Sequence, residues 1–353
     1  MKLYDIAMLR MYNQRIVGDK FNRPEEVVRH LGAIQAQDYQ SALWAIGLRM
    51  KKADKADVER ALAEGKIVRT WPMRGTLHFV ATEDAHWMMD LLVSKNIRAA
   101  ALRGDKRFGL NDNVINQCKR VIQKALRGGK SLSRPELYQV LERQDIDTKN
   151  SRGLHILGRL ALEKVICFGP RKDKQQVFVL FDEWISESKK LSRDESLAKL
   201  AIRYFTGHGP AQIKDLAWWS GLSIKDIGVG IELAGPELVK EVADGKTYWM
   251  APKQSRVVKS NTAYLLPAFD EFLVAYRDRS ASLEAIHAKH INPGANGMLS
   301  PVIVINGQVL GTWKRITKRG MIDIELKPFA QLATDQMKSI DKEKEAYLKF
   351  LNL

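Results

Sequence analysis

Apolar residues recur at helical spacing through most of the first hundred positions, and two shorter runs alternate instead. The helical spacing predicts helices around residues 3–16, 24–34, 41–50 and 55–64. The sequences IVRTWPM and TLHFV that follow have the pattern of strands. Residues 83–103 return to helical spacing, and we expect one connecting helix there.

The clearest order of elements begins at residue 111. We expect a helix over 111–126, a break at a Gly-Gly pair, and a second helix capped by Ser133. A third helix over about 150–163 leads into the strand-like sequences VICF and QVFVLF, joined by the basic loop 169–174. Three helices followed by a hairpin is the order of a winged helix.

The same order can be read upstream and again downstream. Downstream helices around 194–206, 210–219 and 223–234 lead into ELVKEVADGKTYWMA, where Asp-Gly indicates a hairpin turn. The fold class we expect is a helix-rich α+β chain with three tandem winged-helix modules that form a concave DNA-binding channel. We predict four regions, namely winged helix 1 with its connecting helix (1–104), winged helix 2 (105–190), winged helix 3 (191–255) and a C-terminal hairpin region (256–353).

The C-terminal region has a different texture. It contains the β-rich stretch PVIVINGQVLGTWKRI, in which Asn306-Gly307 predicts a two-residue hairpin turn. A charged helix from about Phe329 is expected to close the chain.

Composition adds a partner class to this picture. The 353 residues are 45% hydrophobic and 28% charged, as in ordinary globular proteins. Lysine and arginine number 57 against 41 acids, a net charge of +16, which favours a polyanion such as nucleic acid as the partner. The alternative is a generic basic surface or one that contacts anionic lipid.

Membrane and redox chemistry find little support in the sequence. The longest apolar runs fall far short of the roughly 20 residues of a membrane span, and the first residues lack the apolar core of a secretory signal. The two cysteines, Cys118 and Cys167, are too few for a disulfide scaffold and lack zinc-site spacing, so we expect both to be reduced and structural. We therefore expect a cytoplasmic protein with no membrane partner.

The segment GAIQAQDYQ gathers three glutamines within six residues. In a helix Gln35 and Gln37 would point roughly 200° apart, whereas in an extended chain they would share one face. The spacing therefore predicts a bend after the preceding helix. The alternative is that these carboxamides only cap backbone groups at a helix end.

Several cations could contact DNA in the winged-helix modules. In the second module the third helix and the wing carry a set that would contact phosphates, namely Arg152, His155, Arg159, Arg171, Lys172 and Lys174. In the first wing, Trp71, Arg74 and His78 suit stacking and charge contacts with a nucleotide. The alternatives are a solvated cationic face, a core Trp71 and a half-buried His78.

Two C-terminal segments carry further candidates. Arg277 and Arg279, with Asp270 and Asp278, could touch the DNA backbone or belong to an internal salt-bridge network. The hairpin at Asn306-Gly307 is a candidate probe of a DNA groove or a structural ribbon, and its return strand carries Trp313, Lys314 and Arg315. His287 and His290 have no evident further ligands, so we expect no metal.

Five blocks in order give a more specific indication. The sequences GAIQAQDYQSALWAIGLR, RTWPMRGTLHFV, YFTGHGPAQIKDLAWWSGLS, LLPAFDEFLVAYRDRS and VLGTWKR together resemble the AlkZ/YcaQ-like winged-helix DNA glycosylases over nearly the whole chain. The resemblance implies removal of alkylated bases, including guanines alkylated at N7 and, in some members, interstrand crosslinks. It also implies a catalytic Gln-x-Gln or Gln-x-Asp pair, and Gln35 and Gln37 match the first, AlkZ-like form. Asp38 lies one residue beyond the matching position and receives no such role.

This resemblance gives the glutamines a chemical reason. An N7-alkylated guanine already carries positive charge, so the departing base needs little protonation. Two carboxamides can hold the attacking water and stabilise an oxocarbenium-like sugar without deprotonating anything. We therefore predict a monofunctional DNA glycosylase without metal or cofactor, acting as a nucleoid-associated monomer on double-stranded DNA that contains alkylated bases. The usual route is flipping of the base into a pocket. Because a bulky crosslink cannot enter a pocket whole, we expect instead action on a lesion left in or near the helix, and an open groove would distinguish the two.

Two other classes remain as alternatives. A winged-helix transcriptional regulator would bind DNA without catalysis, normally as a dimer on paired half-sites. A sequestering protein would keep the basic surface and release no base.

Overall fold

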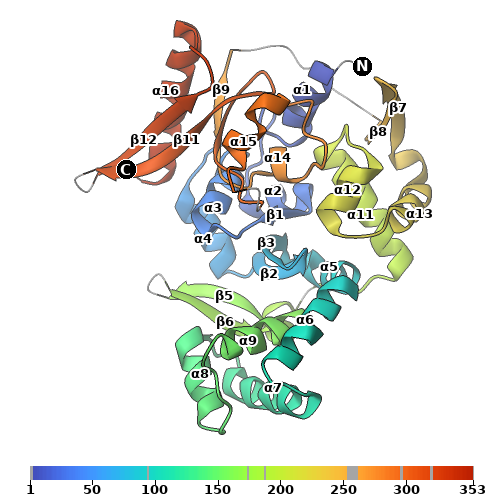
Figure 1. Cartoon of the computed structure of the whole chain (residues 1–353), viewed down its shortest axis with the longest axis vertical. Helices are drawn as coiled ribbons and strands as arrows, with labels where there is room; N and C mark the ends of the chain where they lie inside the picture. Colours follow the sequence, from blue (N-terminus) through green and yellow to red (C-terminus); the bar gives the residue numbers. More distant parts are fainter. Residues whose placement is uncertain are drawn as a thin grey trace. The chain divides into compact units, whose positions relative to one another are not determined.

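The computed structural model of the chain describes residues 3–93, 95–172, 175–186, 188–252, 261–294, 297–318 and 321–352. The chain divides into two compact units (Figure 1). Unit 1 comprises Met1–Glu59 and Asp194–Leu353, and unit 2 comprises Arg60–Arg193. The boundary between them falls within helix α4 (Lys55–Ala63).

Unit 1 is mostly helical. Its helices besides α4 are α1 (Leu3–Asn13), α2 (Pro24–Leu31), α3 (Tyr39–Gly47), α11 (Arg193–His208, whose first residue lies in unit 2), α12 (Ile213–Ser220), α13 (Ile224–Ala234), α14 (Glu271–Val274), α15 (Ala288–Ile291) and α16 (Thr334–Phe350). Its strands are β1 (Ala33–Gln35), β7 (Val239–Ala243), β8 (Lys246–Met250), β9 (Ala263–Leu266), β10 (Val302–Ile305), β11 (Gln308–Lys318) and β12 (Met321–Pro328).

A four-stranded antiparallel sheet in the order β12-β11-β10-β9 supports one side of unit 1. Helix α16 packs against β9, and α3 packs against α16. Trp44 of α3 fixes this arrangement, because its indole N–H donates to the carbonyl of Leu265 at 2.8 Å and its ring contacts Tyr347 and Phe350. The helix that follows the two glutamines is therefore anchored in a packed core.

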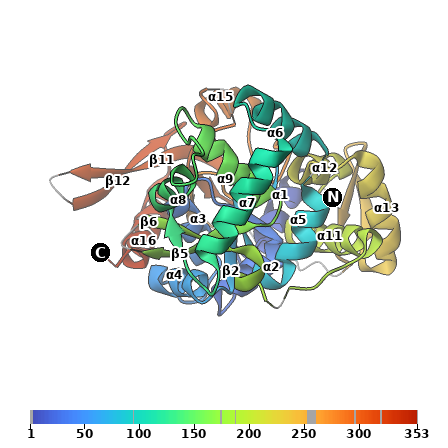
Figure 2. The ribbon, with the colours of Figure 1, turned by 90° about the horizontal axis from the view of Figure 1, so that it is seen from below.

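Unit 2 contains helices α5 (Ala85–Leu92), α6 (Lys95–Arg107), α7 (Asp112–Leu126), α8 (Arg134–Glu142), α9 (Arg152–Leu162) and α10 (Phe181–Trp184). Its strands β2 (Ile67–Met73), β3 (Thr76–Ala81), β4 (Leu132–Ser133), β5 (Ile166–Lys172) and β6 (Gln175–Leu180) lie in the order β3-β2-β5-β6-β4. Helices α7, α8 and α9 lie close together (Figures 1 and 2) and enclose an apolar core that includes Cys118, Ile122, Leu137 and Leu160.

Most of the predicted elements are confirmed. The capped helix after Ser133 begins as expected, with Glu136 completing a reciprocal capping box. Both two-residue turns are present, and Asp244, Asn306 and the glycines after them have the positive φ angles that such turns require. Cys118 and Cys167 are buried and free, and burial raises the pKa of both thiols, that of Cys118 to about 11.

Several boundaries differ from the prediction, and the helix expected over 24–34 ends at Leu31, before the strand Ala33–Gln35. The single connecting helix over 83–103 is wrong, because α5 ends at Leu92 and Val93 leaves the helical conformation with a ψ of 80°. The basic loop is shorter, since β5 continues through Lys172, and Lys174 lies outside the described residues. The last helix begins at Thr334 instead of near Phe329, whose ring stacks on that of His287.

The mixed composition of elements, with about half of the chain helical, confirms a helix-rich α+β protein. The division into three winged helices and the concave channel stay predictions. Within the described residues, no helix combines the length and the apolar character needed to cross a membrane.

Candidate active site

The Gln-x-Gln segment lies between α2 and α3 of unit 1. Helix α2 ends at Leu31, because Gly32 follows with a φ of 81°, which other residues adopt only with strain. Residues Ala33–Gln35 are then extended as β1, and the chain bends at Gln37 and Asp38. The bend predicted from the glutamine spacing is confirmed.

The same bend precedes α3, and the two glutamines differ in how much of each side chain is exposed to solvent. Asp38 is the N-cap of α3, and its carboxylate accepts the backbone N–H of Ser41 at 2.9 Å. Gln35 is only 8% exposed, whereas Gln37 is exposed. The segment thus joins one anchored glutamine to one that faces solvent.

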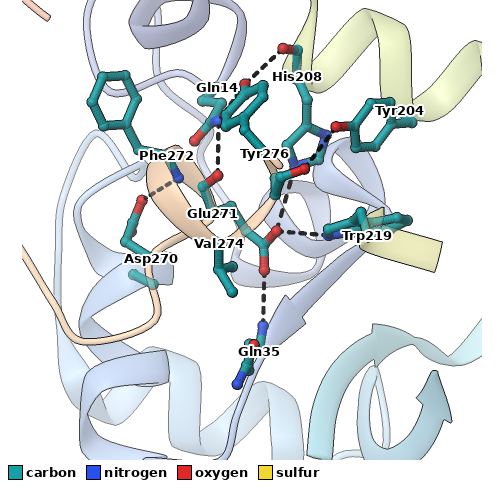
Figure 3. A network of polar contacts seen from close by, with 12 residues as sticks. Gln14, Gln35, Tyr204, His208, Trp219, Asp270, Glu271, Phe272, Val274 and Tyr276 are labelled. Carbon is teal, nitrogen blue, oxygen red and sulfur yellow. Dashed lines mark hydrogen bonds and ion pairs between the residues drawn. The ribbon is translucent and has the colours of Figure 1, made fainter. Parts of the chain in front are cut away.

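A buried carboxylate holds the strand that carries Gln35. Glu271, the first residue of α14, is fully buried. Its Oε1 accepts the backbone N–H of Gln35 at 3.0 Å, and its Oε2 accepts the indole N–H of Trp219 at 2.8 Å. The Nε2 of His208 lies 3.6 Å from the same Oε2. Figure 3 shows this carboxylate between the three groups, with the side-chain nitrogen of Gln35 directed away from it.

Further buried hydrogen bonds fix the backbone of Glu271. The side-chain amide of Gln14 donates to the Glu271 carbonyl at 3.3 Å and to the Tyr276 hydroxyl at 3.0 Å. That hydroxyl in turn donates to the His208 carbonyl at 2.6 Å (Figure 3). Burial raises the pKa of Tyr276, so its hydroxyl stays protonated and remains a donor.

The residue before Glu271 forms a buried ion pair. Two nitrogens of Arg49 donate to the two carboxylate oxygens of Asp270 at 2.8 and 2.9 Å, and neither side chain is more than 1% exposed. Arg49 also donates to the carbonyl and side-chain oxygens of Gln14. For Asp270, the internal salt-bridge alternative is therefore confirmed.

A groove beside the glutamine strand carries positive charge. It has a volume of about 540 Å³ and lies between α2 and α11. Its lining comprises the cations Arg29, Lys199 and Arg203 together with His30, Glu195, Ala198, Ile202 and Thr206. A Cβ atom on Gly32 would lie 3.3 Å from the Cδ atom of Arg203. The groove is therefore adjacent to Gly32, the residue before β1.

The first wing, in unit 2, offers less to a ligand than its sequence indicates. His78 is fully buried, its Nδ1 is 2.9 Å from the Thr76 carbonyl, and its Nε2 is 3.3 Å from the Arg74 guanidinium. Burial, followed by the Arg74 charge, lowers the pKa of His78 to about 3, so this histidine is neutral. Trp71 is partly buried and packs on Phe168 with ring centroids 5.0 Å apart. The half-buried-histidine and core alternatives fit these two residues better than a DNA contact does.

The cationic side chains of α9 form ion pairs and hydrogen bonds with other residues of unit 2. Arg159 pairs with Asp105 at 3.0 Å and with Glu163 at 2.9 Å, while His155 contacts the other oxygen of Asp105 at 2.6 Å. Arg152 donates to the carbonyls of Phe108 and Asp147. In this structure these side chains attach α9 to the end of α6 and the neighbouring loops, which disfavours the phosphate role predicted for them.

Other candidates are presented at the surface. Arg171 and Lys172 at the end of β5 are exposed, as are Lys314, Arg315 and Arg277. Arg279 is half-buried and donates to the Leu273 carbonyl at 2.8 Å.

Trp313 and Asp278 fit the alternatives of a structural ribbon and an internal salt bridge better than a contact with DNA. Trp313 is buried, and its indole N–H donates to the Leu266 carbonyl at 2.8 Å, so this residue belongs to the core of the ribbon and does not probe a groove. Asp278 pairs with Lys246 at 2.7 Å. Partial burial alone would raise the pKa of the Asp278 carboxyl, but the hydrogen bonds from Lys246 and Ser280 outweigh it and lower this pKa.

His287 and His290 flank Phe329, and the described residues contain no cluster of three groups able to hold a metal ion.

Comparison with known proteins decides the family. The sequence matches the family described as DNA glycosylase AlkZ-like over residues 28–350. The chain belongs to the AlkZ-like DNA glycosylase family. It is therefore an enzyme of the DNA glycosylase class, with DNA as its substrate.

Two individual relatives agree with this assignment. A curated protein of Streptomyces sahachiroi named interstrand DNA cross-link repair glycosylase is 23% identical over 334 residues, which cover 90% of this chain and 88% of the relative. The solved structure of Streptomyces sahachiroi DNA glycosylase AlkZ matches with a TM-score of 0.81 at 21% identity, covering 100% of this chain and 97% of that one. At this identity the structural likeness shows the common fold.

In this AlkZ-like glycosylase, sequence reasoning missed the groups that support the glutamines. Glu271, Trp219 and Gln14 were not singled out, although Glu271 lies in one of the five blocks. The sequence does contain an indication of these groups, because two adjacent acids lie inside the apolar run LLPAFDEFLV. Acids buried in such a run need hydrogen-bond or charge partners from elsewhere in the chain. The block that contains Trp219 supplies one of those partners.

Proposed function

We propose that this DNA glycosylase excises cationic alkylated purines of the N7-alkylguanine type by attack of water at the C1′ carbon. Gln35 and Gln37 hold the water and stabilise the positive charge that develops on the sugar. The observation that supports this role most directly is the construction of the segment: a strand anchored at Gln35 by a buried carboxylate, followed by a bend that exposes Gln37.

The chemistry requires no strong acid or base. A purine that is alkylated at N7 already bears positive charge, so the glycosidic bond is weakened before the enzyme acts. A carboxamide oxygen accepts a hydrogen bond from water and presents partial negative charge to an oxocarbenium-like sugar, and pre-organised dipoles of this kind stabilise a transition state effectively. Because a glutamine is a poor general base, neutral unmodified purines should resist the enzyme.

We extend the proposal to bulky adducts and interstrand crosslinks. The named activity of the Streptomyces sahachiroi relative supports this substrate class. Exposure of Gln37 also supports it, because a lesion that remains in or near the duplex can reach a residue at the surface more readily than one in an enclosed cavity.

The proposed DNA contacts are the cations that the structure presents to solvent. They comprise the exposed Arg171 and Lys172 in the second wing and Arg277, Lys314 and Arg315 in the C-terminal region, together with the partly exposed Arg74 in the first wing. We add the groove cations Arg29, Lys199 and Arg203, since the groove lies next to Gly32. Such cations would supply affinity for phosphates without reading sequence. The enzyme would bind through three tandem winged helices as a monomer.

A base-release assay tests the proposal. A duplex with a single N7-methylguanine is incubated with the wild-type chain, the Gln35→Ala/Gln37→Ala double variant and Gln40→Ala, and free base and alkali-labile sites are measured under single turnover. We expect the double variant to lose at least about 100-fold in rate, roughly 2.7 kcal/mol of transition-state stabilisation, while it still binds the duplex. Gln40→Ala, a glutamine change in the same segment outside the pair, should keep the wild-type rate.

The assay also separates the competing functions. A winged-helix regulator or a sequestering protein would bind the duplex and release no base. Release by the double variant at the wild-type rate would remove the glutamines from the mechanism even if the wild-type chain is active.

A further inference from the structure

The N–H of Gln35 has an unusual partner for a strand residue. It donates to a side-chain carboxylate supplied by Glu271, 236 positions further along the chain. Ala33–Gln35 is only three residues long and begins after a glycine that ends a helix. All three residues are buried, and α2 and α3 both contact the strand, so the bond to Glu271 adds to this packing and fixes its last residue, Gln35.

The choice of a carboxylate at this position has a cost. Glu271 is fully buried, and burial of an ionised group is unfavourable unless hydrogen bonds and charge compensate for it. The compensation comes from two N–H donors, Gln35 and Trp219, with His208 at 3.6 Å. The buried cation Arg49 is committed to the neighbouring carboxylate of Asp270.

A carboxylate does what a carboxamide cannot do here. Both Glu271 oxygens are acceptors, and each meets one donor, so the side chain is held in one orientation by Trp219 while it fixes Gln35. A glutamine in the same place would have a single acceptor oxygen, and its amino group would have to face one of the two N–H donors. The pairing therefore selects an acidic side chain.

We infer that Glu271 is a positioning residue of the glycosidic reaction, acting through the backbone of Gln35 to set where that carboxamide meets water and the sugar. This inference rests on the proposed function of the two glutamines. Glu271 itself touches neither the sugar nor the base. Trp219 orients Glu271, while Gln14 holds the Glu271 carbonyl and thereby the start of α14.

The test compares variants that differ in the number of acceptor oxygens at position 271 and in the number of N–H donors that face them. In Glu271→Gln, the conflict between the amino group and a donor should lower the single-turnover rate of base release from the N7-methylguanine duplex about 10- to 100-fold. The Kd for that duplex should remain unchanged. In Glu271→Gln/Trp219→Phe the second donor is gone, so the amide oxygen can face Gln35, and the rate should recover several-fold over Glu271→Gln alone.

A merely structural role makes the opposite prediction for the double variant. Loss of a second buried hydrogen bond would then add to the damage, and no recovery would be seen. The matched control is Asp215→Asn, which alters another buried carboxylate of unit 1 that accepts backbone N–H groups, from Arg277 and Asp278. It should lower the unfolding temperature and leave the rate per folded molecule unchanged.

Amide hydrogen exchange at Gln35 gives a second readout if Glu271→Gln folds poorly. Exchange at this N–H should accelerate in the single variants Glu271→Gln and Glu271→Asp where these remain folded, and the rate of base release should fall with it. Unchanged exchange, or a wild-type rate in Glu271→Gln, overturns the inference. The Gln35→Ala/Gln37→Ala result is independent: if that variant is inactive while Glu271→Gln is normal, only the positioning role fails.

Discussion

Gly32 illustrates how one backbone angle places the glutamines. Its φ of 81° turns the chain out of α2 and into β1, and a side chain on it would meet the Arg203 stem at 3.3 Å and the Trp219 ring at 3.5 Å. Only glycine adopts this angle without strain. The entry into the strand therefore depends on this residue as much as on the hydrogen bond at its end.

We expect Gly32→Ala to lower the free energy of unfolding by about 1–3 kcal/mol, the usual cost of a strained backbone angle. The rate of base release should fall as well, because the start of β1 shifts. Urea denaturation and the N7-methylguanine assay measure the two effects. Gly228→Ala is the control, since Gly228 lies inside α13 with nothing within 4 Å, and alanine there should be neutral or stabilising by up to about 1 kcal/mol. Equal behaviour of the two variants would contradict the role given to the φ of Gly32.

The candidate residues show what can be predicted at this scale. Gln35 and Gln37 were found from a local pattern, because spacing and a family resemblance are both properties of neighbouring letters. Glu271 could not be paired with Gln35 in this way, since the contact joins positions 236 apart. His78 and Trp313 failed as surface contacts for a related reason: each has a polar tip on an apolar body, and tertiary packing decides which side faces water.

At the scale of elements, local signals worked where the local cause is strong. Capping at Ser133 and the Asp-Gly and Asn-Gly turns were predicted because each is determined within four residues. The break between α5 and α6 was missed, since helical spacing continues through it. The carbonyl of Val93 instead accepts the side chain of Arg98 at 3.3 Å.

The ion pair of Arg49 and Asp270 joins the turn after α3 to the turn before α14, and so it connects the elements on either side of the site. Removal of one partner leaves a buried charge without compensation. We expect Arg49→Met or Asp270→Asn to cost about 3–5 kcal/mol in free energy of unfolding. The double variant should cost clearly less than the sum of the two, as urea denaturation in a double-mutant cycle would measure.

An exposed pair provides the contrast for that cycle. Lys344 and Asp341 lie three residues apart on α16, and Lys344→Met should cost less than about 1 kcal/mol. Additive costs for the Arg49 and Asp270 substitutions would mean that the two side chains do not stabilise unit 1 as a pair.

At the scale of the whole molecule, the net charge of +16 indicated a polyanionic partner, and membership of the DNA glycosylase family agrees with it. The formal charge overstates what DNA can use, however. Arg10 and Arg49 are buried, and Arg159 is tied to two acids. The net charge can be counted from the sequence, so the partner class was predictable. Which cations can reach DNA depends on packing, so several of the individual contacts were not predictable.

Each unit also contains a neutral histidine, the partly buried His30 in unit 1 and the fully buried His78 in unit 2, and together they connect stability to pH. Burial is the main reason that the pKa of His30 in unit 1 falls to about 4 and that of His78 in unit 2 to about 3, against about 6.5 in the unfolded chain. The unfolded state therefore binds protons below pH 6.5 while the folded state does not. Both histidines stabilise the fold above pH 6.5, and this contribution is lost as the pH falls toward 4.

Glu343 acts in the opposite sense, so the prediction is best stated as a difference between variants. Burial raises the Glu343 pKa to about 7, which favours the folded state at low pH and withdraws that contribution between about pH 4.5 and 7. In His78→Gln this acidic term and that of His30 remain, and only the His78 term is lost. The free energy of unfolding of the wild-type chain minus that of His78→Gln should therefore fall by about 1.4 kcal/mol per pH unit between pH 6 and 4.5. Urea denaturation followed by tryptophan fluorescence at several pH values measures this difference, with exposed His290→Gln as the control. A difference that stays constant with pH would show that His78 takes up a proton equally well in both states.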